Sequence, residues 1–205
     1  MHKLTGPLLL MFLFSGYVAK AQTCVYRNLS HHYTFKVISV KNTADEVGTS
    51  ARKVSLLIFK NNKLNQQINF GAEYLFEGVF KKDTASRSYI TGKNKNADVP
   101  DYDYGDVVIA DLNFDGKEDI AVKHDSGGNG GPRYNFYLQD MYGTFKIDHY
   151  LTDYIKSFPE EINNKQKILR TQTHANMRQE ASKLFQYNPK TKKWKLLKWE
   201  MVDAG

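Results

Sequence analysis

Residues 104–125 read Tyr-Gly-Asp-Val-Val-Ile-Ala-Asp-Leu-Asn-Phe-Asp-Gly-Lys-Glu-Asp-Ile-Ala-Val-Lys-His-Asp. Two apolar, partly β-branched runs, 107–110 and 120–122, flank a loop of Asp, Asn and Gly. β-branched residues favour strands, whereas Asp, Asn and Gly favour tight turns. This stretch therefore predicts two neighbouring strands joined by a short polar loop, and not a pair of helices.

The same pattern of short β-branched and aromatic runs, separated by polar turn clusters, extends along the chain. Strands are predicted at 33–40, 54–60, 67–76, 106–110, 120–124, 134–138 and 144–149. A terminal hairpin is predicted from 184–187, a turn at 188–191, and 194–201. Only 156–170 has helical potential, and Pro159 and the Asn163-Asn164 pair oppose a long helix there. We expect an all-β, antiparallel fold, either sandwich-like or resembling a small propeller.

Length and composition fit one globular domain. The chain has 205 residues, of which 41% are hydrophobic and 25% charged, with a formal charge of +7. This share of hydrophobic residues is sufficient for a hydrophobic core, and the composition excludes a disordered tail. The single cysteine, Cys24, has no partner within the chain, which excludes an intramolecular disulfide.

The first 21 residues have the parts of an export signal: Lys3, an apolar run over 8–14, and a small-x-small end at 19–21. We expect cleavage after Ala21 and a single exported domain over 22–205, in the periplasm or outside the cell. The apolar run is too short for a membrane span. A lipoprotein attached through Cys24 is the less favoured alternative, since Ala21-Gln22-Thr23 forms a poor lipobox.

The loop between the two decisive strands has the spacing of a calcium site. Its expected ligands are side-chain oxygens at positions 1, 3, 5 and 9 and the main-chain carbonyl at position 7, namely Asp111, Asn113, Asp115, Asp119 and Lys117. Gly116 occupies position 6, where the chain must turn sharply. Position 12, which is glutamate in an EF-hand, is Val122. Asp106 or Asp125 is a candidate for a further ligand, and a metal-free Asx turn is the alternative.

A glycine-rich loop follows at 125–134, Asp-Ser-Gly-Gly-Asn-Gly-Gly-Pro-Arg-Tyr. A phosphate-binding loop would be followed by a helix, and here a strand is predicted. The residues support two interpretations of this loop equally well. One is a partner-binding loop that presents Ser126, Gly127, Arg133 and Tyr134, and the other is a long hairpin connection.

Catalysis and nucleic-acid binding have little support in the sequence. Ser126 and His124 share a face of a strand, but no oxyanion-hole motif accompanies them. We therefore expect no enzyme. The basic segment 155–200 contains Trp194 and Trp199, yet its lysines fit the solvated side of an edge hairpin better than a nucleic-acid surface.

The calcium loop resembles the Asp-x-Asn-x-Asp-Gly-x-x-Asp loops of FG-GAP and VCBS repeats. Its single copy, followed by a Ser-Gly loop and an aromatic strand at 134–138, is more similar to periplasmic inhibitors of invertebrate-type lysozyme and related calcium-binding immunity proteins. This resemblance covers 104–138. It implies a bound calcium ion and a loop, with Ser126, Gly127 and Tyr134, that enters the cleft of a peptidoglycan hydrolase. The alternative is a cell-surface interaction module with a structural calcium.

Overall fold

The computed structural model describes residues 21–41, 51–128 and 130–203. The predicted signal peptide therefore lies outside the described residues, except for Ala21. The first sheet is an antiparallel meander in the order β1-β2-β3-β4, formed by β1 (Ala21–Tyr26), β2 (Tyr33–Lys41), β3 (Arg52–Lys60) and β4 (Lys63–Ala72).

The second sheet has the order β5-β6-β7-β8-β9, with β5 (Ser86–Ser88), β6 (Val107–Ala110), β7 (Asp119–Asp125), β8 (Arg133–Gln139) and β9 (Phe145–Ile147). The third is again a meander, with β10 (Glu161–Asn163), β11 (Ile168–His174), β12 (Gln179–Asn188) and β13 (Lys193–Asp203). Two short helical segments, η1 (Pro100–Tyr102) and η2 (Tyr150–Ile155), lie between strands. In the described ranges, no helix is long and apolar enough to cross a membrane.

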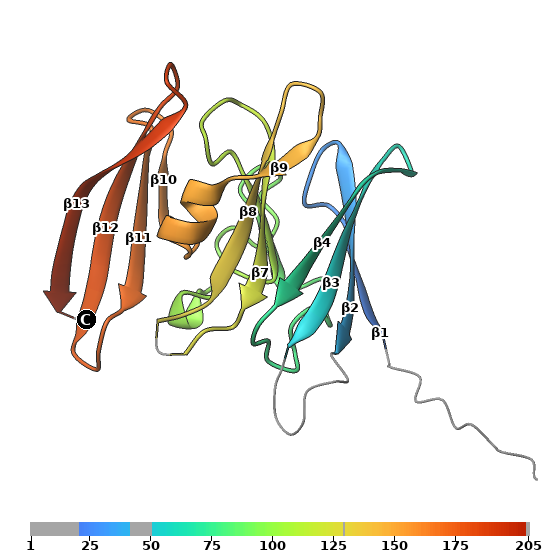
Figure 1. Cartoon of the computed structure of the whole chain (residues 1–205), viewed down its shortest axis with the longest axis horizontal. Coiled ribbons are helices and arrows are strands. Elements are labelled where there is room, and N and C mark those ends of the chain that lie inside the picture. Colours follow the sequence, from blue (N-terminus) through green and yellow to red (C-terminus); the bar gives the residue numbers. More distant parts are fainter. Residues whose placement is uncertain (1–20, 42–50, 129, 204–205) are drawn as a thin grey trace, which may run out of the picture.

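The three sheets stand side by side, with the β5–β9 sheet in the middle (Figure 1). Both faces of the middle sheet are buried. Alternate residues of β6 enter different cores: Val107 and Ile109 pack with the first sheet, whereas Val108 and Ala110 pack with the third. This explains why the decisive apolar runs have no polar alternation, since a strand buried on both faces needs apolar residues at every position.

The predicted fold class is confirmed, because the structure is all-β with mainly antiparallel sheets. Most of the predicted strands and the terminal hairpin match β2, β3, β4, β6–β9, β12 and β13. No long helix forms over 156–170, as Pro159 and the Asn163-Asn164 pair indicated: a short helical turn precedes it at η2, and most of 161–174 forms β10 and β11. One pair, β5 with β6, is parallel.

Cys24 lies in β1, and its side chain is only 6% exposed because it packs in the first core. Burial raises the pKa of its thiol. A lipid anchor on Cys24 would require this side chain to leave the first core. The lipoprotein alternative stays the less favoured prediction.

Candidate functional site

The predicted calcium loop joins the adjacent antiparallel strands β6 and β7, as expected. Its turn depends on Gly116, whose φ is +82°, a conformation that glycine adopts without steric cost. Phe114 also has a positive φ, of +61°, and its ring is buried against the third sheet. The glycine at position 6 and the strand–loop–strand arrangement were therefore both predicted correctly.

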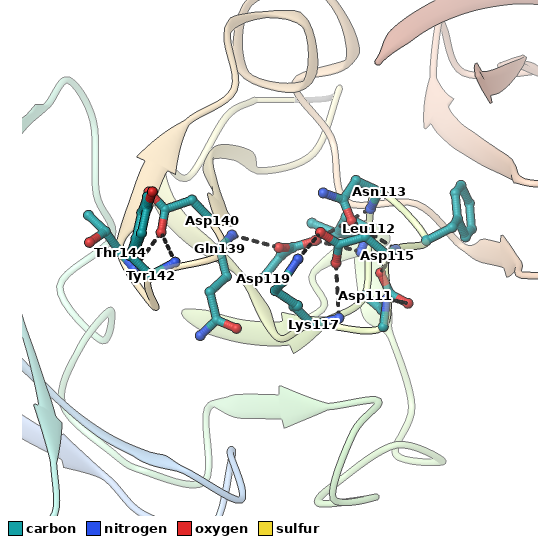
Figure 2. A network of polar contacts seen from close by, with 12 residues as sticks. Asp111, Leu112, Asn113, Asp115, Lys117, Asp119, Gln139, Asp140, Tyr142 and Thr144 are labelled. Carbon is teal, nitrogen blue, oxygen red and sulfur yellow. Dashed lines mark hydrogen bonds and ion pairs between the residues drawn. The ribbon is translucent and has the colours of Figure 1, made fainter. Parts of the chain in front are cut away.

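The side-chain oxygens of this loop face its own backbone amides (Figure 2). Asp111 accepts hydrogen bonds from the amides of Asp115, at 3.0 Å, and Gly116, at 2.9 Å. Asn113 Oδ1 accepts from the Asp115 amide at 3.1 Å. The carboxylate of Asp115 forms an ion pair with Lys117 Nζ at 2.7 Å. The loop is thus ordered by its own Asx-type contacts.

Asp119 is the most deeply buried of the predicted ligands, with no exposed surface. Its carboxylate accepts from the amides of Leu112 and Gln139, both at 2.9 Å, and so joins the loop to the end of β8. Burial raises the pKa of Asp119 to about 8, and the nearby carboxylates of Asp115 and Asp111 act in the same direction. Without a cation, the Asp119 carboxyl therefore favours its protonated form near neutral pH, whereas Asp115 lies at the exposed end of the loop.

These oxygens suit a hard cation in number and type. In the part of the chain that the structure describes, however, no three His, Cys, Asp or Glu side chains are grouped closely enough to hold a metal ion. Asp111, Asn113, Asp115 and Asp119, with the carbonyl of Lys117, would hold calcium after the side chains turn inward from the amides. The donor set therefore fits calcium, and the hydrogen-bonded arrangement is the one expected of a metal-free Asx turn.

The two candidates for a further ligand lie elsewhere. Asp106 precedes β6, at the strand end remote from the loop, and forms an ion pair with Lys123 at 3.2 Å. Asp125 ends β7, where its carboxylate accepts from the amide of Gly127 at 2.8 Å. Neither carboxylate is available to the calcium loop.

The glycine-rich loop begins at the opposite end of β7 from the calcium loop (Figure 1). At about 3.3 Å per residue, this strand separates the two loops by about 20 Å. A calcium ion bound between β6 and β7 would therefore not contact the base of the glycine-rich loop. The two loops are linked through strand β7, which is hydrogen-bonded on one side to β6 and on the other to β8.

Two residues expected at the exposed end of this loop are buried. Tyr134 has no exposed surface and packs against Phe136 and Phe158 in the second core. The hydroxyl of Ser126, which is 6% exposed, accepts a hydrogen bond from the Phe76 amide at 2.9 Å. The prediction that Tyr134 is a contact residue was wrong, because its side chain enters the second core. Ser126 is nearly buried but lines the groove beside this loop, so its contact role stays a prediction. Arg133 is exposed and Gly127 is half-buried, so their predicted contact role stays a prediction.

Gly127 has the strictest steric requirement in this loop. Its φ is +66°, and a Cβ there would collide with the carbonyl oxygen of Gly131. A Cβ on Gly128 would meet nothing within 4 Å. We expect Gly127→Ala to lower the free energy of unfolding by at least about 1 kcal/mol and Gly128→Ala to have little effect, as urea denaturation would measure. Equal stability of the two variants would contradict this loop conformation.

Beside the glycine-rich loop lies an open groove of about 670 Å³, whose lining includes Phe76, Asp101, Gly127, Gly128, His174 and Met177. Phe76 is 56% exposed and Met177 is 97% exposed. The segment after β4 reaches this groove because the Tyr74 carbonyl accepts from the Ser126 amide at 2.6 Å. Phe76 and Met177 carried no recognisable motif, so sequence reasoning missed them.

No known protein family model matches this chain. No curated protein sequence matches it either. Among solved structures, it is similar to one described as a Xanthomonas type IV secretion system related protein, with a TM-score of 0.57 and 18% sequence identity. The similarity covers 84% of this chain and 79% of the other. At this identity it supports a shared fold.

Proposed function

We propose that this chain is an exported, non-enzymatic, calcium-binding protein that blocks a peptidoglycan hydrolase. The groove beside the glycine-rich loop is the observation that carries the proposal. Two large apolar side chains that line it, Phe76 and Met177, are exposed; Phe76 follows β4 and Met177 lies between β11 and β12. Exposed apolar side chains of this kind often mark protein–protein contacts.

The groove is rigid at its base. The hydroxyl of Ser126 accepts a hydrogen bond from the Phe76 amide. The Tyr74 carbonyl accepts one from the Ser126 amide, and the Glu73 amide donates one to the His124 carbonyl at 3.2 Å. A surface that is ordered before binding loses less conformational entropy when a partner arrives. Exposed glycine backbone at the loop allows close approach to that partner.

The side chains at the glycine-rich loop favour binding over catalysis. In the described residues, Ser126 is hydrogen-bonded to the Phe76 amide and makes no hydrogen bond to His124. A serine nucleophile needs a base within about 3.2 Å, as well as access to substrate. The secretion-system relation of the structural neighbour also agrees with an immunity protein that neutralises a delivered hydrolase.

The test is an inhibition assay. The purified protein is mixed with lysozymes of the invertebrate, chicken and goose types, and clearing of a peptidoglycan suspension is followed. We expect stoichiometric inhibition of at least one hydrolase. Phe76→Asp and Met177→Asp should weaken it by at least about tenfold, since central apolar contacts dominate such interfaces.

Leu64→Asp is the matched control, because Leu64 is also exposed, at 54%, but lies on the edge strand β4 of the first sheet. This variant should inhibit as well as the unaltered protein. Inhibition that survives both groove substitutions would exclude the groove as the inhibitory surface. A protein that inhibits no hydrolase but binds calcium would instead be an extracellular interaction module.

A further inference from the structure

A second, smaller cavity of about 210 Å³ lies on the other side of the glycine-rich loop. Its walls are the loop, the start of β8, the end of η2 and the neighbouring parts of β11 and β12. Three basic side chains line it, and none of its lining residues is acidic: the bases are Arg133, Lys156 and Lys183. The cavity is therefore a site of concentrated positive charge.

The positive charges are only weakly compensated. Arg133 forms an ion pair with Asp125 at 3.9 Å, which is too long for a hydrogen bond. In the described residues, neither Lys156 nor Lys183 forms an ion pair. Like charges that line one small cavity repel each other, and a bound anion would relieve this repulsion.

Hydrogen-bond donors complete the lining. Ser157, Thr171 and Thr173 bring hydroxyl groups, and the glycines that line the cavity have no side chain of their own. Thr171 and Lys183 are directly paired across β11 and β12, so they share one face of the third sheet. Such a mixture of guanidinium, ammonium and hydroxyl donors suits an oxyanion.

The backbone at Lys156 is strained. Its φ and ψ are +67° and −49°, and the Ser157 amide donates to the Ile155 carbonyl at 2.8 Å, which defines a γ-turn with positive φ. This conformation is unfavourable for a residue with a side chain, and such strain is concentrated at functional sites. The Lys156 carbonyl accepts from the Tyr134 amide at 2.8 Å, so the turn is fixed to the start of β8.

We propose that this cavity is an oxyanion-binding site that accepts a phosphate or carboxylate group. Arg133, at the start of β8, and Lys183, on β12, contact the anion, and Lys156 adds a third charge. This cavity shares the glycine-rich loop with the proposed inhibitory groove, because Gly127, Gly128 and Gly131 line both. Its three basic side chains line the cavity and not the groove, so anion binding can be measured without any hydrolase.

The experiment is a titration of the purified protein with inorganic phosphate and, separately, with acetate, at pH 7 and constant ionic strength. Binding is followed by calorimetry and by the emission of Trp199, which is paired with Lys183 on the neighbouring strand and is 63% exposed. We expect saturable binding of at least one anion. The anion with the smaller dissociation constant shows whether the cavity prefers a phosphate or a carboxylate.

Arg133→Gln and Lys183→Gln should each weaken binding by about tenfold or more. Lys63→Gln is the control, because Lys63 is an exposed base on β4, in a different sheet. These side chains lie at the surface, so all three variants should fold, which their unfolding midpoints would verify. Absence of saturable binding, or equal weakening by Lys63→Gln, would overturn the proposal.

Discussion

Replacing Lys123 with methionine is expected to lower the free energy of unfolding by about 3 to 5 kcal/mol. Lys123 is only 2% exposed, on β7 of the middle sheet. Its ammonium group lies 2.7 Å from the carboxylate of Asp103 and 3.2 Å from that of Asp106. The substitution keeps the length of the side chain but removes the charge that compensates two carboxylates.

Asp106 is the reason for this large effect. It is 2% exposed, and its carboxylate also accepts from the Phe80 amide at 2.7 Å, so it cannot turn toward water without losing contacts to the segment after β4. Burial raises its pKa, and the charge of Lys123 is the largest opposing influence. Without Lys123, Asp106 either remains as an unpaired buried charge or takes up a proton, and both states destabilise the fold.

Urea denaturation of the two proteins would measure the difference. Lys81→Met is the matched control, because Lys81 pairs with Glu77 at 3.1 Å on the surface, where removing such a pair costs at most about 1 kcal/mol. A double variant, Lys123→Met with Asp106→Asn, should recover part of the loss. Equal stability of Lys123→Met and Lys81→Met would contradict the buried ion-pair network.

Saturating calcium is expected to produce the second large effect. At a concentration of about 100 times its dissociation constant, a ligand that binds only the folded state adds about 2.7 kcal/mol to the free energy of unfolding. The unfolding midpoint should therefore rise with calcium and fall when a chelator is added. Magnesium should have a smaller effect, since it requires closer octahedral geometry than this irregular loop offers.

Asp111→Asn and Asp115→Asn should each remove most of the calcium-dependent stabilisation. Each change removes one negative charge from the loop. Asp115→Asn keeps an oxygen that can accept from the Lys117 amide, and Asp111→Asn keeps an acceptor for one of the two amides that its carboxylate now binds. The variants should therefore remain folded in chelator. Asp98→Asn is the control, because Asp98 is an exposed carboxylate outside the loop. An unchanged midpoint under saturating calcium would identify the loop as a metal-free Asx turn.

Local features were predictable because they depend on a few neighbouring residues. The β-branched runs on either side of 111–118 indicated strands, the glycine at position 6 indicated a turn with positive φ, and Asn188-Pro189 indicated the terminal hairpin. Backbone preference and side-chain alternation act over two to ten residues, so a single stretch of sequence is sufficient to reveal them.

The position of each sheet against the others is a property of tertiary packing. An aromatic run such as 134–138 has a large side chain at nearly every position, so alternation alone does not show that Tyr134 is buried in the second core. Burial on both faces of the middle sheet results from the first sheet packing against one face and the third sheet against the other. For this reason the expected contact role of Tyr134 was wrong.

The sequence by itself therefore determined the all-β class, the strand–loop–strand calcium motif and the terminal hairpin. Only the tertiary structure showed that Phe76 and Met177 flank one groove and that Arg133 and Lys183 line one cavity. The members of each pair are far apart in sequence and come from different sheets or the loops that follow them. They meet because the sheets pack to bury apolar surface, an effect that depends on the whole chain and leaves no local pattern.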